Sequence, residues 1–262
     1  MLLIVASACM SIAPRVISFD LDDTLWPVAP VIEAAERALF AWLETRHPQA
    51  VHGHSIESMR ALRARIAEQF PERRHDLTFL RRRALAAQFS SAGFGAAGVG
   101  AAGVGAAGVG TAGPGTADAD AGGLEPLVDE AFEVFLAERN RVELYADVMP
   151  SLARLRARYR LFALSNGNAD LKRCGIGDFF DGHVTAIAAG AAKPDAQIFA
   201  QLERIAGVSA AEVLHVGDDP LADVVGATRA GMQAVWLNRD ARPWPAQFSP
   251  PARTISTLAE IM

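Results

Sequence analysis

The stretch from Val16 to Trp26 constrains the fold more than any other, because an apolar run there ends abruptly in three carboxylates, Asp20, Asp22 and Asp23. A run rich in β-branched and aromatic residues is typical of a fully buried strand. In an open parallel sheet, reactive groups lie just beyond the carboxyl ends of the strands. We therefore expect Asp20 and Asp22 at the mouth of a crevice.

The spacing of Asp20 and Asp22 favours chemistry over a purely structural role. Residues two apart in an extended segment point the same way, so both carboxylates can face one reacting atom. Two acids this close repel each other and persist where a cation, a proton or a catalytic function stabilises them. The alternative is an acidic loop that caps the following helix.

From Asp147 onward the sequence alternates between strand and helix patterns. This alternation predicts a parallel, doubly wound sheet. We expect strands at 161–164, 184–187, 213–217 and 234–237, and helices at 147–159, after 193–195 and at 223–230.

The segment between the first strand and residue 145 shows helical periodicity instead. Apolar spacings predict helices through 31–43, 56–70, 76–89 and 127–135, with Asp76 as an N-cap. The predicted fold class is therefore α/β, a Rossmann-like parallel sheet with an inserted all-helical domain. We divide the chain into a leader plus first strand (1–28), the helical domain (29–144) and the rest of the sheet domain (145–262).

A Gly-Ala-Ala-Gly-Val repeat interrupts the helical domain at 94–123. Glycine loses the most backbone entropy on ordering, and these side chains bury too little apolar surface to compensate. We interpret the repeat as a flexible insertion.

Composition excludes several functional classes. The net charge of -5 and the pI near 5.7 argue against nucleic-acid or anionic-membrane partners. Cys9 and Cys174 make no disulfide framework, which fits a reducing, cytoplasmic setting.

The opening Met1–Cys9 is apolar but too short to span a bilayer and lacks a basic start, so we interpret it as a leader ahead of a start at Met10.

Polar groups also follow two later strands. Ser165 and Asn166 follow 161–164, Asp218 and Asp219 follow 213–217, and Lys193 lies between them. Each motif is weak alone. Their order and spacing together resemble the haloacid dehalogenase superfamily of phosphotransferases, whose four motifs match Asp20-Leu21-Asp22-Asp23-Thr24, Ser165-Asn166, Lys193-Pro194, and Gly217-Asp218-Asp219 through Asp223.

The resemblance implies a catalytic role for three residues. Asp20 would be the nucleophile, since a carboxylate forms an acyl phosphate that water can later cleave. Asp22 would act as general acid and then as general base. Lys193 would be the third catalytic residue and, with Ser165 and Asn166, would hold the phosphoryl oxygens. Leu21 and Thr24 are further phosphate-binding candidates, and Thr24 would also brace Asp22.

Charge counting indicates a metal. The site carries up to five carboxylates against one lysine, and a phosphate monoester adds about two more negative charges. An all-oxygen site of this kind suits Mg²⁺. By the resemblance, the metal ligands are the Asp20 carboxylate, the main-chain carbonyl of Asp22 and the Asp218 carboxylate, with Asp219 and Asp223 acting directly or through water.

The predicted reaction is hydrolysis of a small phosphorylated metabolite by a monomer or small homo-oligomer. Asp22 argues against the dehalogenase branch, whose leaving group needs no such acid, and a helical insertion between the first two motifs resembles a C1-type cap. Segments 164–180 and 214–227 resemble bacterial phosphatases acting on flavin mononucleotide and on 5-amino-6-(5-phospho-D-ribitylamino)uracil. Cap candidates for specificity are His75, Asp76, Thr78 and Arg81.

Two alternatives remain open. One is a sugar-phosphate, phosphoglycolate or nucleotide phosphatase of the same superfamily. The other is a non-catalytic binding protein that keeps the fold, against which the intact Asp20, Asp22, Lys193 and Asp218 argue. His215 lies inside an apolar strand, and we interpret it as a hydrogen-bonded core histidine rather than a ligand.

Overall fold

The computed structural model describes residues 12–95 and 123–261. It divides into two compact units, a core unit (Met1–Pro27 and Glu143–Met262) and a helical unit (Val28–Val142). The predicted leader Met1–Cys9 and most of the repeat at 94–123 lie outside the described residues.

The core unit is built on a six-stranded sheet in the order β3-β2-β1-β4-β5-β6, with every pair parallel. This is the doubly wound α/β sheet that the sequence predicted. The strands are β1 (Val16–Phe19), β2 (Arg160–Ser165), β3 (Gly182–Thr185), β4 (Val213–Gly217), β5 (Gln233–Leu237) and β6 (Thr254–Ile255).

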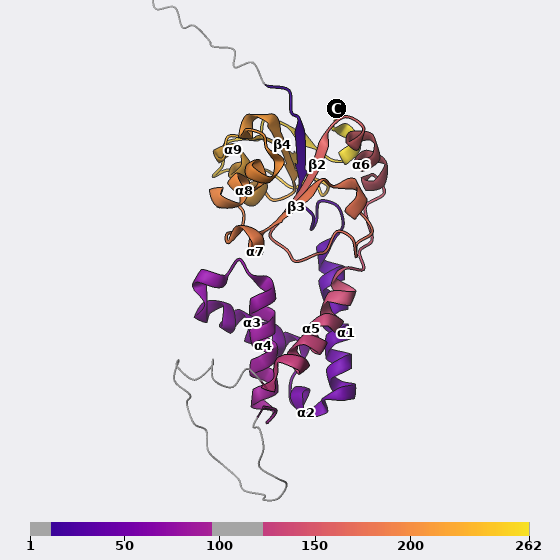
Figure 1. Ribbon diagram of the computed structural model, residues 1–262, viewed down its shortest axis with the longest axis vertical. Helices are drawn as coiled ribbons and strands as arrows, with labels where there is room; N and C mark the ends of the chain where they lie inside the picture. Colours follow the sequence, from indigo (N-terminus) through magenta and orange to yellow (C-terminus); the bar gives the residue numbers. More distant parts are fainter. Residues whose placement is uncertain (1–11, 96–122, 262) are drawn as a thin grey trace, which may run out of the picture. The chain divides into compact units, whose positions relative to one another are not determined.

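Helices cover both faces of this sheet, with α8 and α9 on one side of the strands and α6 on the other (Figure 1). The helical segments of the core unit are α6 (Val148–Arg156), α7 (Ala186–Ala189), α8 (Ala196–Ala206) and α9 (Gly226–Arg229), with the short turns η3 (Gly177–Phe179), η4 (Ala210–Glu212), η5 (Pro220–Val225) and η6 (Leu258–Glu260).

The central position of β1 explains its composition. All four of its residues are buried, because β2 and β4 flank it and helices cover both faces. In the register, Ser18 is paired with His215 and Phe19 with Val216, so β1 and β4 end at the same level. The groups that follow the two strands therefore emerge side by side.

One strand prediction was wrong at its boundary. The strand expected at 184–187 ends at Thr185, and Ile187 lies in α7. Thr185 stops the strand because its side chain accepts a hydrogen bond from the Ala188 amide and caps the helix. The two-residue β6 was not predicted, since so short a segment has no readable periodicity.

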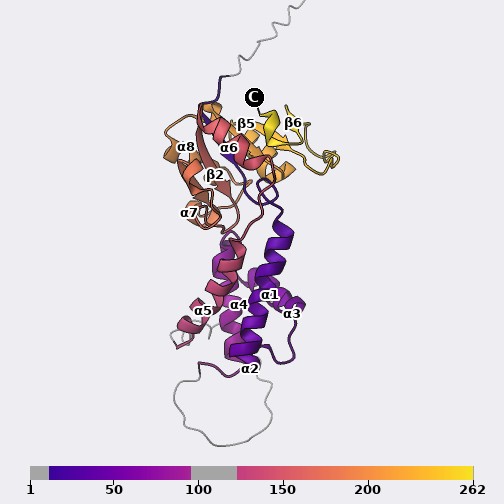
Figure 2. The same ribbon diagram turned by 90° about the vertical axis from the view of Figure 1, so that its right-hand side faces the viewer.

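The helical unit contains α1 (Val28–Arg46), α2 (Pro48–Val51), α3 (Ile56–Gln69), the turn η1 (Pro71–Arg73), α4 (Leu77–Ser91) and α5 (Glu125–Arg139). In Figure 2, α1, α4 and α5 run alongside one another.

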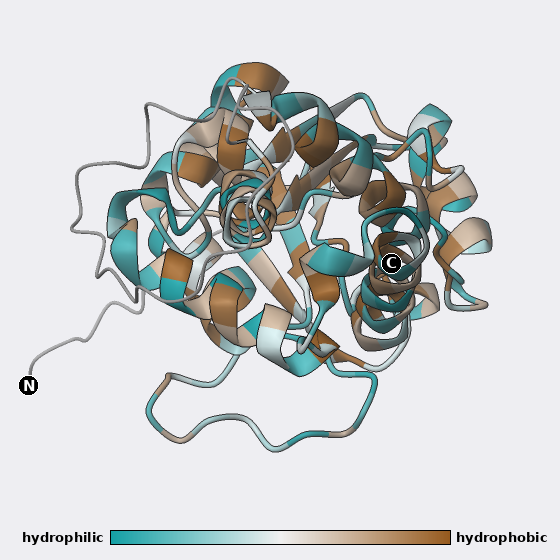
Figure 3. Cartoon of the chain, turned by 90° about the horizontal axis from the view of Figure 1, so that it is seen from below, coloured by the Kyte–Doolittle hydropathy of each residue, from teal (hydrophilic) through white to brown (hydrophobic). Residues whose placement is uncertain are grey.

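Burial in the helical unit follows helical spacing. On α1 the buried residues include Val31, Ala35, Leu39 and Leu43, which lie four apart on one face. In Figure 3, hydrophobic (brown) and hydrophilic (teal) residues are interspersed along the helices. As predicted, Asp76 caps α4 by accepting a hydrogen bond from the Phe79 amide. Within the described residues, no helix combines the length and the apolar character needed to cross a membrane.

Candidate active site

Asp20 is placed by the strand that precedes it. Its amide donates to the Val216 carbonyl at 2.9 Å, continuing the β1–β4 ladder by one residue, and the residue is 8% exposed. The chain then turns sharply, with Asp23 at a φ of 58°, a conformation that Asp tolerates better than most residues. Leu21, another phosphate-binding candidate, is fully buried in the hydrophobic core.

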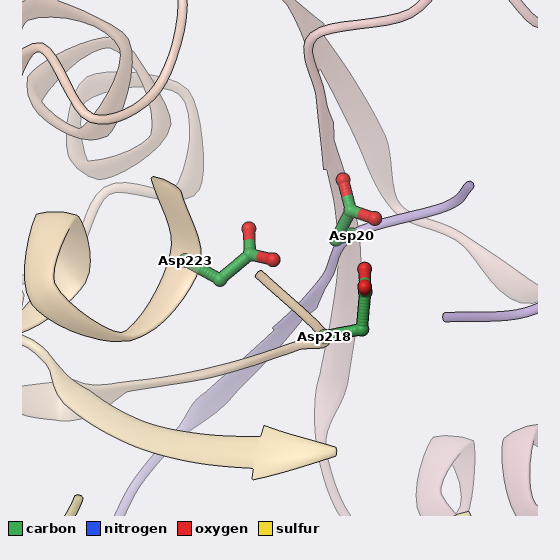
Figure 4. Close-up of side chains that lie close together, drawn as sticks. All are labelled: Asp20, Asp218 and Asp223. Carbon is green, nitrogen blue, oxygen red and sulfur yellow. The ribbon is translucent and has the colours of Figure 1, made fainter. Parts of the chain in front are cut away.

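Three carboxylates from different elements converge beyond these strand ends. One oxygen from each of Asp20, Asp218 and Asp223 lies within 4.8 Å of the others. In Figure 4, Asp20 comes from the end of β1, Asp218 from the loop after β4, and Asp223 from a helical turn, with its carboxylate directed toward the other two. Hard oxygen donors at this spacing fit Mg²⁺.

Lys193 compensates part of this negative charge. Its Nζ donates to Asp20 Oδ1 and to Asp223 Oδ1, each at 2.6 Å, and the residue is buried. Burial opposes its protonation, yet the two carboxylates raise the pKa of Lys193 above its ordinary value. Burial raises the pKa of Asp20, which Lys193 only partly offsets, whereas Lys193 and His215 outweigh burial and lower the pKa of Asp223. A divalent cation would favour ionised Asp20.

Asp218 is the most accessible member of the cluster. Burial and then the Asp223 charge raise its pKa to about 6. Its Oδ2 accepts from Arg242 Nη2 at 3.0 Å, and its Oδ1 accepts from the Thr24 hydroxyl at 3.5 Å. We expected Thr24 to brace Asp22; the structure instead directs its hydroxyl to Asp218.

The structure brings Asp223, rather than Asp219, into the cluster. Asp219 is exposed, and its Oδ1 accepts hydrogen bonds from the Leu221 and Ala222 amides, capping η5. Asp223 folds back over Gly217, where an added Cβ would lie 2.2 Å from the Asp223 Cγ. Glycine at 217 therefore leaves the space that the Asp223 carboxylate occupies.

Asp22 is held by an aromatic neighbour. The Trp26 indole Nε1 donates to Asp22 Oδ1 at 2.9 Å. Trp26 is itself fully buried, so it fixes the direction of the Asp22 carboxylate. This role of Trp26 was not predicted, although a tryptophan four residues after an acid in a tight turn could have indicated it.

Ser165 and Asn166 lie at the end of β2. The buried Ser165 hydroxyl accepts a hydrogen bond from the Gly167 amide at 2.9 Å. Asn166 Nδ2 donates to the Lys193 carbonyl at 3.0 Å, and Asn166 Oδ1 accepts from the Lys193 amide at 2.7 Å. The Asn166 side chain therefore positions the Lys193 backbone, although we expected it to hold a phosphoryl oxygen.

The order of these strand ends and the lysine between them is matched by a known family. A family model described as haloacid dehalogenase-like hydrolase matches residues 14–231. The chain belongs to this family.

Individual relatives of this haloacid dehalogenase-like hydrolase are phosphatases. The Escherichia coli K12 5-amino-6-(5-phospho-D-ribitylamino)uracil phosphatase YigB is 30% identical over 94% of this chain and 93% of its own. A Thermus thermophilus phosphoserine phosphatase is 36% identical over 54% of this chain and 59% of its own. Among solved structures, a Pseudomonas syringae 2-haloacid dehalogenase has a TM-score of 0.79 and 34% identity, covering 94% of this chain and 95% of that one.

A buried chain of hydrogen bonds lies beneath the acids of this haloacid dehalogenase-like hydrolase. His215 Nε2 lies 3.1 Å from Asp223 Oδ1, and His215 Nδ1 lies 2.8 Å from the Ser18 hydroxyl. Burial lowers the pKa of His215. The structure agrees with a hydrogen-bonded core histidine but adds a contact to the cluster. Ser18 is the polar residue of β1 and His215 that of β4, and the two are paired in the register of the sheet. One polar residue in each of two apolar strands is a signal that could have predicted the Ser18–His215 hydrogen bond.

The cap candidates have different surroundings within the helical unit. Asp76 is occupied as a helix cap and also accepts from Arg73 Nη2 at 2.8 Å. His75 and Thr78 are half-buried. Arg81 lies over the Phe135 ring and beside Glu36.

Proposed function

We propose that this phosphatase of the haloacid dehalogenase-like family hydrolyses a small phosphorylated metabolite with Mg²⁺, through an aspartyl phosphate on Asp20. The observation that carries the proposal is the convergence of Asp20, Asp218 and Asp223, with Lys193 donating to Asp20 and Asp223. Such a group of acids suits a divalent cation, which when bound would neutralise the transferring phosphoryl group. Asp20, Asp218 and Asp223 would hold it.

In the first step an Asp20 carboxylate oxygen attacks phosphorus, and the bond from phosphorus to the ester oxygen breaks. Asp22 donates its proton to the departing oxygen, so that a neutral alcohol leaves. The Trp26 indole holds Asp22 in place for this transfer.

In the second step water attacks the phosphorus of the aspartyl phosphate. Asp22, now ionised, accepts the proton from this water, and the bond between phosphorus and the Asp20 oxygen breaks. Inorganic phosphate leaves, and both acids return to their starting states. Lys193 offsets negative charge throughout, while Asn166 fixes the lysine through its backbone.

For the substrate, we propose flavin mononucleotide and 5-amino-6-(5-phospho-D-ribitylamino)uracil. The support is the E. coli relative, whose name gives the uracil compound and whose similarity covers nearly the whole chain. Phosphoserine and other small phosphate esters are the competing class, because the Thermus relative is named for phosphoserine. We further propose a cytoplasmic setting, supported by the lack of a disulfide framework in the sequence.

Dehalogenation is the second candidate, favoured by the Pseudomonas syringae structure. In that reaction Asp20 would displace a halide from carbon, and a halide leaves without a proton. Asp22 would then have no acid role, yet it is present and oriented by Trp26. Chloride release from 2-chloropropionate, measured beside phosphate release, separates the two reactions.

The test of the proposed function is phosphate release from a metabolite panel that includes both proposed substrates, with Mg²⁺ and with a chelator. Asp20→Asn should abolish turnover, a loss of at least ~10⁴-fold, because an amide is a poor nucleophile. Asp129→Asn is the matched control, since it makes the same chemical change at an exposed residue of α5 that pairs with Arg82. Turnover by Asp20→Asn, or equal turnover in the chelator, would reject the proposal.

A further inference from the structure

Arg242 lies beside the acid cluster and donates twice to one of its members. Its Nη2 donates to the Asp218 carboxylate oxygen Oδ2 and to the Asp218 main-chain carbonyl, each at 3.0 Å. Both acceptors belong to the same residue, so one nitrogen links the backbone of Asp218 to the end of its side chain. A side chain linked to its own backbone in this way keeps one rotamer. Arg242 therefore fixes the direction of the Asp218 carboxylate.

Other contacts leave the second oxygen of this carboxylate accessible. The Trp236 indole Nε1 also donates to the Asp218 carbonyl, at 2.8 Å, and Trp236 is only 3% exposed, so the position of this carbonyl is fixed. Oδ1 of Asp218 has a longer contact, at 3.5 Å from the Thr24 hydroxyl. In Figure 4 the Asp218 side chain is directed toward Asp20. Arg242 thus occupies Oδ2, and Oδ1 is the oxygen that is better placed to bind a cation.

The loop after β5 holds Arg242 in this position. The Arg242 amide donates to Asn238 Oδ1 at 2.9 Å, and Asn238 Nδ2 donates to the Arg242 carbonyl at 2.8 Å. Between the two residues, Ala241 has a φ of 52°, a left-handed conformation that is unfavourable for a residue with a Cβ atom. Backbone strain of this kind persists where the surroundings fix the chain, and it is concentrated at functional sites. We therefore expect the position of Arg242 to have a function.

Folding stability alone does not explain the contact between Arg242 and Asp218. The Arg242 side chain is 46% exposed, and exposed ion pairs contribute little to folding, because water screens the charges and a long side chain loses rotamer freedom. A cavity of about 130 Å³ is lined by both residues, so Arg242 has room for other rotamers. Close packing therefore does not impose the contact either.

We propose that Arg242 is a positioning residue that orients Asp218 to bind the divalent cation through Oδ1. The inference rests on the proposed metal site and adds a residue that acts on the cation through Asp218. Hydrogen bonds that orient metal ligands typically raise metal affinity by about 10- to 100-fold. The alternative is repulsion between the guanidinium charge and the cation, which would weaken binding. The two effects have opposite signs, so one substitution distinguishes them.

The experiment is a calorimetric Mg²⁺ titration of the full chain without substrate, for the wild type, Arg242→Met and Arg242→Lys. Met has a similar stem but neither the charge nor the donor. We expect Arg242→Met to bind Mg²⁺ at least about tenfold more weakly. Arg242→Lys should recover part of this loss, because it keeps the charge and one donor of similar reach. The thermal midpoint without Mg²⁺ should change little in either variant, whereas a purely stabilising role would lower it.

Arg229→Met is the matched control. It removes the same charge from an exposed arginine of α9 and should bind Mg²⁺ like the wild type. If Arg242→Met does not fold, Asn238→Ala takes its place in the titration. That substitution removes both side-chain hydrogen bonds to the Arg242 backbone, so it should also weaken Mg²⁺ binding.

Mg²⁺ binding by Arg242→Met that equals or exceeds that of the wild type would overturn the inference. Tighter binding would show that repulsion dominates. An equal loss of affinity in Arg229→Met would also overturn it, because the net charge of the chain would then explain both variants. The wild type separates this inference from the proposed function. If the wild type binds Mg²⁺ and Arg242→Met binds it equally well, only the inference fails, whereas no binding by the wild type rejects the metal site and the inference with it.

Discussion

At the scale of single residues, the tautomer of His215 follows from its two neighbours. The pKa of Asp223 is lowered, so its carboxylate can only accept, and His215 must carry its proton on Nε2. Nδ1 is then an acceptor, and the Ser18 hydroxyl donates to it. Ser18 thus sets the imidazole that donates to Asp223, which places a positioning residue directly beneath the cluster.

We predict that His215→Leu lowers kcat and Mg²⁺ affinity by about 10- to 100-fold, the usual effect of losing a partner of a metal-site carboxylate. His215→Gln should retain most of both, because its amide nitrogen can replace the Nε2 donor. Calorimetric Mg²⁺ titration and kcat, each with the thermal midpoint recorded, make the measurement. If Gln and Leu behaved alike, His215 would be a packing residue only.

Asp20, Asp22 and Asp218 could be singled out, because a buried strand that ends in acids has few structural explanations. Lys193 follows no strand, and only the resemblance to the haloacid dehalogenase superfamily pointed to it. The choice between Asp219 and Asp223 could not be made. It depends on the space above Gly217 and on the capping bonds of η5, and neither is encoded in residue spacing.

At the scale of elements, Asp147 links the start of α6 to Arg239, which follows β5, and to the start of η6. It stands at the start of α6, and its carboxylate accepts two hydrogen bonds from Arg239 at 3.0 and 3.1 Å. The Thr257 hydroxyl and the Leu258 amide donate to it at 2.8 and 2.6 Å. Burial opposes ionisation, but these donors lower the pKa of Asp147.

We predict that Asp147→Ala destabilises the protein by about 2 kcal/mol, since charge-assisted hydrogen bonds contribute about 1.5–3 kcal/mol each and solvent screens this half-buried site. A carboxyl with a lowered pKa stabilises the folded state above its unfolded pKa of about 4, and this contribution is lost as pH falls. Urea unfolding at neutral and acidic pH tests both points. A variant as stable as the wild type at pH 7 would contradict the assignment.

The elements themselves were largely predictable, because periodicity and caps are local. The sheet and the cap of α4 at Asp76 followed from such signals. The boundary between β3 and α7 did not, since one capping hydroxyl on Thr185 decided it.

At the scale of the whole molecule, the core unit gathers more negative than positive charge at the ends of its central strands, and a bound cation would balance it. We predict that Mg²⁺ raises the thermal midpoint, because it binds the folded state. The affinity should fall below about pH 6, since the raised pKa of Asp218 means that protons then compete with the metal. Calorimetric Mg²⁺ titrations between pH 5 and pH 8 measure this. Affinity independent of pH would exclude Asp218 as a ligand.

Trapping the phosphorylated enzyme tests directly whether Asp20 is the nucleophile. The wild type is mixed with substrate and Mg²⁺, quenched in acid within the first turnover, digested and analysed by mass spectrometry. We expect one phosphoryl group on Asp20, and none in Asp20→Asn. A phosphoryl group on another residue, or phosphate release with Asp20 never modified, would contradict it.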